Sequence, residues 1–290
     1  MAKFFMLTLR VLKLAVVSSW LTVPAVHAAD ESVVVVGGTG ADCIEDPGCV
    51  NRLHPDIPMV VSAEPGQTIL FHTRDARDAL GASAQQSSEP DNFSSDFGRV
   101  HPITGPVYIS GASAGDVLKV TIVTIEPGPY AWSTGGSSGF VPGLVDGQSQ
   151  VIWRLNRNYA ETDDIPGVRI PNSSFPGIIT TLPGRNEHRR MLEREQALAE
   201  AGGRVSLPLT DYADPEELCG PGGAVAQACL RTIPPREHGG NMDIRYLQAG
   251  VSVYLPCYID GCGLAIGDLH YAQGDGEVSG TAIEMSADVW

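Results

Sequence analysis

Three observations predict a mainly β fold. Short runs rich in β-branched residues recur along the chain and are separated by turn residues, a pattern typical of strands. Glycine and proline are frequent, with 33 and 21 of 290 residues, and they are spread throughout. A helical composition occurs in one segment, 186–201, which is rich in Glu, Arg, Leu and Ala and is followed by Gly202-Gly203. We therefore expect strands, loops and one short helix.

The strands are expected wherever apolar β-branched runs are bounded by turn residues. Glu64-Pro65-Gly66-Gln67, for example, is typical of a tight turn between two strands. The segments 79–98, 130–149 and 211–228 lack such runs and are expected to be loops. The predicted strands are, in chain order, 33–36, 59–62, 68–72, 107–110, 117–125, 150–155, 250–255, 264–270 and 280–285.

The first 28 residues are typical of a secretory signal. Lys3, Arg10 and Lys13 supply positive charge, and the mostly apolar run 14–26 ends at a small-residue cleavage pattern. That run is short for a membrane-spanning helix. We expect cleavage after Ala28 or Ala29, no membrane association afterwards, and one secreted or periplasmic domain over 30–290.

The six cysteines form three close pairs along the chain, Cys43 with Cys49, Cys219 with Cys229, and Cys257 with Cys262. In an exported chain such pairs favour local disulfides. Zinc thiolate ligation is the alternative, but the spacings are wider than those of zinc knuckles. The formal charge of −15 excludes the basic surface that nucleic acid binding needs.

The densest group of chemically active residues lies near the C-terminus. If 264–270 is a strand, Asp268 and His270 point to the same face, because side chains two apart on a strand share a face. The glycine-rich turn that follows can return Asp275 or Glu277 toward them, and Glu284 is flanked by apolar residues. A carboxylate and an imidazole on one face form a pair of metal ligands.

A second polar group, Glu237 to Asp243, lies in a loop with two prolines and two glycines, and it contains Asn241. His101, just before a predicted strand, is a third candidate. His54-Pro55 and Arg74-Asp75 are better explained as a turn and a surface ion pair. A serine or cysteine amidase would need a lysine, and Lys119 is the lysine that remains after the leader is removed.

The stretches PPREHGGNMD (234–243) and GDLHYAQGDGE (267–277) are long and specific, and HPITGP (101–106) is shorter. On these motifs the sequence resembles the acetamidase/formamidase family, most closely over 231–285. The resemblance implies a mainly β, sandwich-like or barrel-like fold, homo-oligomers, and hydrolysis of small linear amides to a carboxylic acid and ammonia. Family members continue beyond Trp290, so we expect the chain to be truncated at its C-terminus.

The resemblance and the residue types together suggest a divalent metal, with zinc expected and calcium as the alternative. Asp243, Asp268, His270 and His101 would hold it. Glu277 or Glu284 would act as general base, and Asn241 would stabilise the oxyanion. Two alternatives stay open: an exported hydrolase of another or a cyclic amide, and a non-catalytic β module that binds calcium. Calcium prefers oxygen ligands, which disfavours His270 in such a site.

Overall fold

Most of the predicted strands form, although several begin or end at other residues. The computed structural model describes residues 32–90, 96–136, 139 and 147–290, and the predicted signal lies outside them. The described strands are β1 (Val34–Gly37), β2 (Cys49–Val50), β3 (Arg52–Leu53), β4 (Val61–Ala63), β5 (Ile69–Thr73), β6 (Ile103–Ile109), β7 (Val117–Thr121), β8 (Ile125–Gly136), β9 (Gln148–Leu155), β10 (Tyr159–Glu161), β11 (Arg169–Pro171), β12 (Phe175–Thr180), β13 (Leu230–Arg231), β14 (Gly239–Asn241), β15 (Ser252–Pro256), β16 (Cys262–His270) and β17 (Glu284–Val289).

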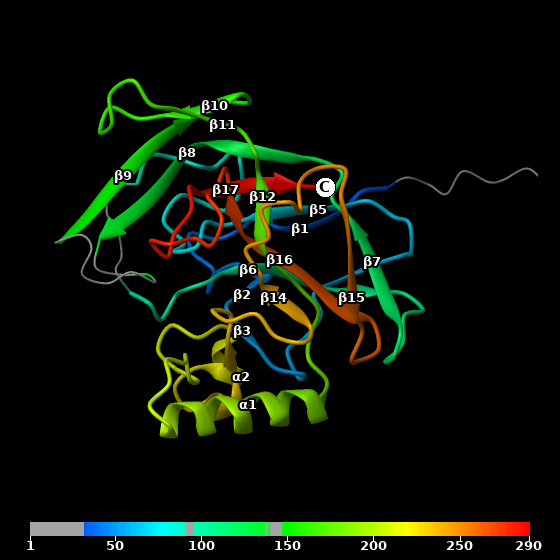
Figure 1. The fold of residues 1–290 in the computed structure, drawn as a ribbon. Helices are drawn as coiled ribbons and strands as arrows, with labels where there is room; N and C mark the ends of the chain where they lie inside the picture. Colours follow the sequence, from blue (N-terminus) through cyan, green and yellow to red (C-terminus); the bar gives the residue numbers. More distant parts are fainter. Residues whose placement is uncertain (1–31, 91–95, 137–138, 140–146) are drawn as a thin grey trace, which may run out of the picture. The chain divides into compact units, whose positions relative to one another are not determined.

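Thirteen of the described strands join one sheet, which confirms the mainly β fold (Figure 1). Its main path runs β11-β10-β9-β8-β17-β16-β12-β14. Strand β6 pairs with β16 and also carries β2 and β4, while β5 pairs with β17 and also carries β1. The pairs β15–β7 and β13–β3 form two small sheets. This branched pairing brings β6, β16 and β17 together although they lie far apart in sequence.

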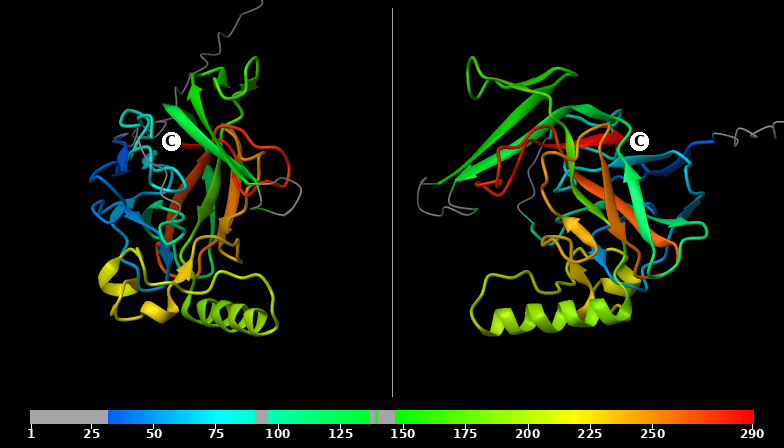
Figure 2. Two further views of the ribbon diagram at one scale, coloured as in Figure 1. Left: turned by 90° about the vertical axis from the view of Figure 1, so that its left-hand side faces the viewer. Right: turned by 45° about the vertical axis from the view of Figure 1, so that its right-hand side comes forward.

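The predicted helix is α1 (Arg185–Glu200), one residue from its expected start and end. Past its last residue the chain turns at Gly202, whose φ of 79° suits glycine, and Gly203 N–H closes the last turn onto Leu198 O. The helix buries Met191 against Leu182 and Leu230. Both views in Figure 2 place α1 at the opposite end of the fold from β10 and β11. No helix among the described residues is long and apolar enough to cross a membrane.

Three local expectations were wrong. The segment 211–228, expected to be a loop, contains α2 (Glu216–Cys219) and the 3-10 turn η1 (Ala226–Ala228), which are too short to show periodicity. Strand β8 enters the expected loop 130–149, because Trp132 is buried and its Nε1 donates to Asp75 Oδ1 at 2.8 Å. Strand β12 was not predicted, because Pro176-Gly177 interrupts its apolar run.

Arg74 is also placed differently from the expectation of a surface ion pair. Its guanidinium is buried and lies 2.7 Å from Asp78 Oδ1 and 3.5 Å from Asp46 Oδ2. Burying a charge is costly unless it is paired, and these two carboxylates pair it. The same cation donates to Thr39 O and so ties the chain before β2 to the end of β5.

The three predicted disulfides are all present. Cys43–Cys49, Cys219–Cys229 and Cys257–Cys262 link each cysteine to its near neighbour in sequence, and no cysteine is free. The first closes the turn before β2, the second joins α2 to the start of β13, and the third joins β15 to β16. Zinc thiolate ligation is thereby excluded for these six side chains.

Candidate active site

Asp268 lies at a branch point of the sheet. One edge of β16 pairs with β12 along its length. The other edge pairs with β6 up to Gly267, and with β17 from Leu269 onward. Asp268 stands where the partner changes, with a φ of 54°. The branch opens the sheet beside its carboxylate, so the start of β17 and the residues before β6 can reach the same space.

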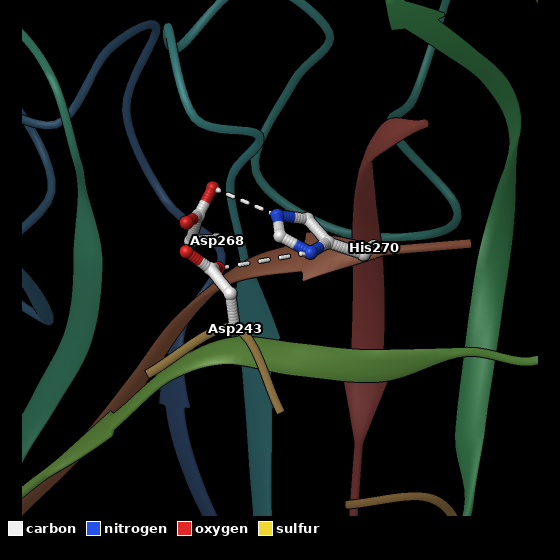
Figure 3. A group of neighbouring side chains, drawn as sticks. All are labelled: Asp243, Asp268 and His270. Atoms are coloured by element: carbon white, nitrogen blue, oxygen red, sulfur yellow. Dashed lines mark ion pairs between the residues drawn. The ribbon is translucent and has the colours of Figure 1, made fainter. Parts of the chain in front are cut away.

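Four carboxylates surround the His270 imidazole. Its Nε2 lies 3.2 Å from Glu284 Oε2, 3.5 Å from Asp268 Oδ1 and 3.9 Å from Glu277 Oε1, and its Nδ1 lies 4.0 Å from Asp243 Oδ1. Figure 3 shows Asp243 and Asp268 on the same side of the imidazole ring. The expectation that Asp268 and His270 share a face is confirmed, and the structure adds Asp243, Glu277 and Glu284 to that pair.

Gly177 of β12 forms the floor under this cluster. A Cβ at this position would lie 2.8 Å from Asp268 Oδ2, 2.8 Å from His270 Cε1 and 2.9 Å from Asp243 Oδ1. Its carbonyl accepts from the N–H groups of Met242 and Asp243, at 3.0 and 3.2 Å. Gly177 therefore makes room for three side chains and anchors the backbone of one of them, a role that the sequence did not predict.

Gln273 orients the His270 ring. Its Oε1 lies 2.9 Å from His270 Nδ1, and its Nε2 donates to Asp243 O at 3.4 Å. Since an amide oxygen only accepts, Nδ1 carries the ring proton in this hydrogen bond. Nε2 faces the carboxylates of Asp268 and Glu284, so it is the ring nitrogen that would become available to a cation once its own proton is lost. Ligand histidines in metalloproteins are held in this way.

The two glutamates differ in their access to solvent. Glu284 is buried, and its Oε1 accepts the Ala282 N–H at 2.7 Å, which leaves Oε2 toward His270. Glu277 lies on the turn after β16, and its side chain is 15% exposed. Asp275 points away and pairs with Arg245 at 3.8 Å, with its side chain 74% exposed. Of the two acids in the turn, Glu277 is the one that returns to the cluster.

His101 approaches the other oxygen of Asp268, with 4.0 Å between Nε2 and Oδ2. Its backbone is held on both sides by Thr232, whose Oγ1 accepts the His101 N–H and donates to His101 O. Asn241 lines the same space, and its Nδ2 donates to Ile233 O at 3.0 Å. Glu237 and His238 lie elsewhere: Glu237 pairs with Arg194, and His238 bonds to Thr180.

The electrostatics of the cluster follow from packing so many acids together. Burial raises the pKa of Glu277 to about 9, and the charge of Glu284 adds to this rise. Burial likewise raises the pKa of Asp243 to about 7, and the charge of Asp268 adds to it. Burial would also raise the pKa of Asp268, but His101 and His270 hold it below its usual range. Burial would lower the pKa of His270, but Glu284 and Asp268 raise it well above its usual value.

The donor set fits a divalent cation. Asp243 Oδ1, Asp268 Oδ1, His270 Nε2 and Glu284 Oε2 are buried and face one another, with no hydrogen-bond partner outside the cluster. Two groups of ligand atoms lie close enough together to hold an ion, Asp243–Asp268–His270 and His270–Glu277–Glu284. Four buried or half-buried carboxylates around one imidazole leave an excess of negative charge, which a bound cation would offset. Carboxylate oxygen and imidazole nitrogen are donors that zinc accepts.

The acids open into a cavity of about 860 Å³. It is lined by the four carboxylates, by Trp132 and by several apolar side chains. Arg77 also reaches this cavity, with its guanidinium stacked 4.6 Å above the Trp132 ring. The cluster is thus at once largely buried and reachable by a small molecule.

The sequence profile of the acetamidase/formamidase family matches residues 41–290. The chain belongs to this family. Over 252 residues it is 34% identical to a formamidase of Methylophilus methylotrophus, covering 81% of this chain and 61% of that protein. Over 259 residues it is 32% identical to an acetamidase of Mycolicibacterium smegmatis, covering 81% of this chain and 63% of that protein.

A solved structure of similar fold is that of the γ-lactamase from Delftia acidovorans. The two structures superpose with a TM-score of 0.75 at 33% sequence identity, over 87% of this chain and 65% of that one. This chain therefore spans a little less than two thirds of the length of each of these relatives. The matched part holds the whole acid cluster, because the family profile extends over Asp243 to Glu284.

Proposed function

We propose that this protein hydrolyses the C–N bond of linear amides, giving a carboxylic acid and ammonia. The observation that carries the proposal is the cluster of Asp243, Asp268, His270, Glu277 and Glu284, whose four carboxylates line a cavity. Family membership supports it, since relatives are named formamidase and acetamidase. Formamide and acetamide are the simplest substrates of this class. The leader-like sequence and the disulfides favour action outside the cytoplasm.

The proposed metal site consists of Asp243, Asp268 and His270, with His101 beside Asp268. A divalent ion bound there would lower the pKa of a bound water and polarise the amide carbonyl. The protein's own part is to fix the ligands: Gln273 sets the His270 tautomer, and Gly177 leaves room for all three side chains. Zinc suits this mixed oxygen and nitrogen donor set better than calcium, which prefers oxygen alone.

Glu277 is the proposed general base. It lies in the cluster, lines the cavity and is more accessible than Glu284. A cation bound in the cluster would lower the raised pKa of Glu277 and so leave it ionised. Glu277 would then take a proton from the attacking water and deliver it to the leaving ammonia. Glu284, with one oxygen held by Ala282 N–H, would keep its second oxygen on His270. Asn241 is the proposed donor to the oxyanion, since its Nδ2 carries a second hydrogen beyond the one given to Ile233 O.

Ammonia release from formamide and acetamide tests this proposal. We expect turnover that is lost after exhaustive chelation and returns with Zn²⁺, and we expect Asp268→Ala to abolish it. Asp163→Ala, which removes an exposed acid paired with Arg154, is the matched control and should keep full activity. Turnover that survives complete metal removal would exclude the metal role, and unchanged turnover in Asp268→Ala would exclude the site.

A cyclic amide is the second candidate substrate, because the γ-lactamase relative is 33% identical to this chain. A simple γ-lactam offered to the same enzyme separates the two. Opening of the lactam ring releases no ammonia, so this reaction is measured by analysis of the amino acid product. A calcium-binding module without catalysis would instead bind Ca²⁺ and gain thermal stability, with no turnover of either amide class.

A further inference from the structure

One wall of the cavity is apolar and is not used by the proposed chemistry. Its side chains come from segments far apart in sequence, the loop before β6, helix α1 and its following loop, and the loops flanking β14. They are Phe97, Leu198, Val205, Ile233 and Met242. Phe97 is 62% exposed and Leu198 is 46% exposed, so two large apolar side chains face solvent beside the acids.

The backbone that carries this wall is held in place. Arg231 donates through Nη2 to the carbonyl oxygens of Phe97 and Val100. On α1, the buried Glu195 forms a two-point ion pair with Arg236, at 2.6 and 3.1 Å. Leu198 lies three residues after Glu195 and therefore close to the same face of the helix. The backbone at Phe97 and the face of α1 next to Leu198 are thus fixed by polar contacts that do not involve the apolar side chains themselves.

The cavity is also large for the simplest substrates. Acetamide has only four non-hydrogen atoms, whereas cavities of about 300–1,000 Å³ typically enclose drug-sized ligands. The observed volume is about 860 Å³. Since formamide and acetamide would engage the acid cluster alone, they would leave the apolar wall uncovered.

We infer that the apolar wall binds the acyl chain of the substrate, so that linear amides with an aliphatic chain longer than acetyl are preferred. The inference rests on the proposed amide hydrolysis and names the substrate class for it. The occupant is apolar because the charged side chains beside this wall already have partners in the protein: Arg194 pairs with Glu237, Glu195 pairs with Arg236, and Arg204 donates to Gly139 O. The occupant is attached to an amide because the wall borders the acid cluster. Each methylene that becomes buried should raise kcat/KM about fourfold.

The test compares acetamide, butanamide and hexanamide with the full metal-loaded protein. We expect kcat/KM to rise along the series, mainly through a lower KM. The variants Phe97→Ser and Leu198→Ser should each reduce the ratio of hexanamide to acetamide kcat/KM by about tenfold. Val123→Ser is the matched control, since Val123 is 59% exposed but lies outside the cavity, and it should leave that ratio unchanged.

Equal kcat/KM for the three amides, or a rise in kcat/KM with chain length that is unchanged in both variants, would overturn the inference while leaving amide hydrolysis intact. A change in oligomeric state in both variants without a change in the ratio would also overturn it, because the wall would then bind a second copy of the chain. If no amide is turned over, calorimetric titration decides: tighter binding of hexanamide than of acetamide, lost in Phe97→Ser, supports the inference, and equal binding overturns it.

Discussion

The His270 imidazole and the Gln273 side-chain amide form a hydrogen bond of 2.9 Å between Nδ1 and Oε1, three residues apart in the chain. Gln273 also donates to the carbonyl of Asp243. It therefore connects two of the proposed ligands. If the proposed metal binds there, its affinity should depend on this uncharged residue.

Replacing Gln273 by Leu should weaken zinc binding about 10- to 100-fold, because the His270 ring loses the acceptor that fixes its tautomer. Competition with a chromophoric chelator measures the change. Gln196→Leu, at an exposed position on α1, is the control and should bind zinc like the wild type. Equal zinc affinity in Gln273→Leu would contradict the positioning role.

Gly177→Ala should lower kcat/KM for acetamide about a hundredfold, since the new methyl group displaces three side chains and small misplacements in an active site are costly. Steady-state kinetics and a zinc titration check this. Gly274→Ala is the control, because a Cβ there meets no atom within 4 Å. Wild-type kinetics in Gly177→Ala would mean that the floor of the cluster is not where the structure places it.

The stability of the protein should decrease on acidification because His238 is buried as a neutral ring. Burial, with the nearby charge of Arg236, lowers its pKa to about 3. Between roughly pH 6.5 and pH 3 the unfolded chain takes up a proton at this histidine that the folded chain does not. The contribution of His238 to unfolding free energy therefore falls by about 1.4 kcal/mol per pH unit as the pH is lowered through this window.

Urea denaturation of the wild type and His238→Asn between pH 7.5 and pH 5 isolates that contribution from those of the other titrating groups. The difference in unfolding free energy between the two proteins should shrink as the pH decreases. Two stability curves that stay parallel over this range would contradict the assignment.

Breaking the buried pair between Glu195 and Arg236 should destabilise the fold. Glu195→Ala leaves the Arg236 guanidinium buried and without its carboxylate, which typically costs about 3–5 kcal/mol. Chemical denaturation gives the value. Asp163→Ala, which removes the partner of Arg154 at the surface, should change stability little. Similar losses in both variants would show that burial does not decide the outcome.

The cysteine pairing predicts no free thiols in the denatured, unreduced protein. Thiol titration in denaturant should give none before reduction and six afterwards. Digestion without reduction should give three short crosslinked pairs, one of which joins Cys257 to Cys262. A peptide that links cysteines from different pairs would disprove the local connectivity.

Local pattern was enough for much of the fold. The period-two runs predicted β5, β9 and β16 closely, and composition predicted α1 to within a residue at each end. Local sequence pattern did not predict strands in which apolar and polar residues do not alternate. In β12 the run is interrupted by Pro176-Gly177. In β8, Trp132 donates a hydrogen bond to Asp75, which lies fifty-seven residues earlier in the chain. Such contacts leave no trace in a short window of sequence.

The candidate site divides in the same way. Asp268 and His270 were paired correctly because two residues on one strand share a face, and this needs no knowledge of the rest of the chain. The sequence also indicated Glu277, Glu284 and Asp243 as candidates from residue type and from family resemblance. It did not predict Gly177 or the role of Gln273, since a glycine that makes room for others looks like any other glycine.

By itself, then, the sequence determined the mainly β class, the helix, the local disulfides, the family and the Asp268–His270 pair, because each depends on residues near one another in the chain or on recognisable motifs. Tertiary structure alone decided that β16 changes partner at Asp268 and that Gly177 forms the floor there, and it alone gave the distances at which the candidates His101 and Glu284 approach. The physical reason is that these approaches depend on the register between distant strands, which is set by burial of the whole sheet rather than by any one segment.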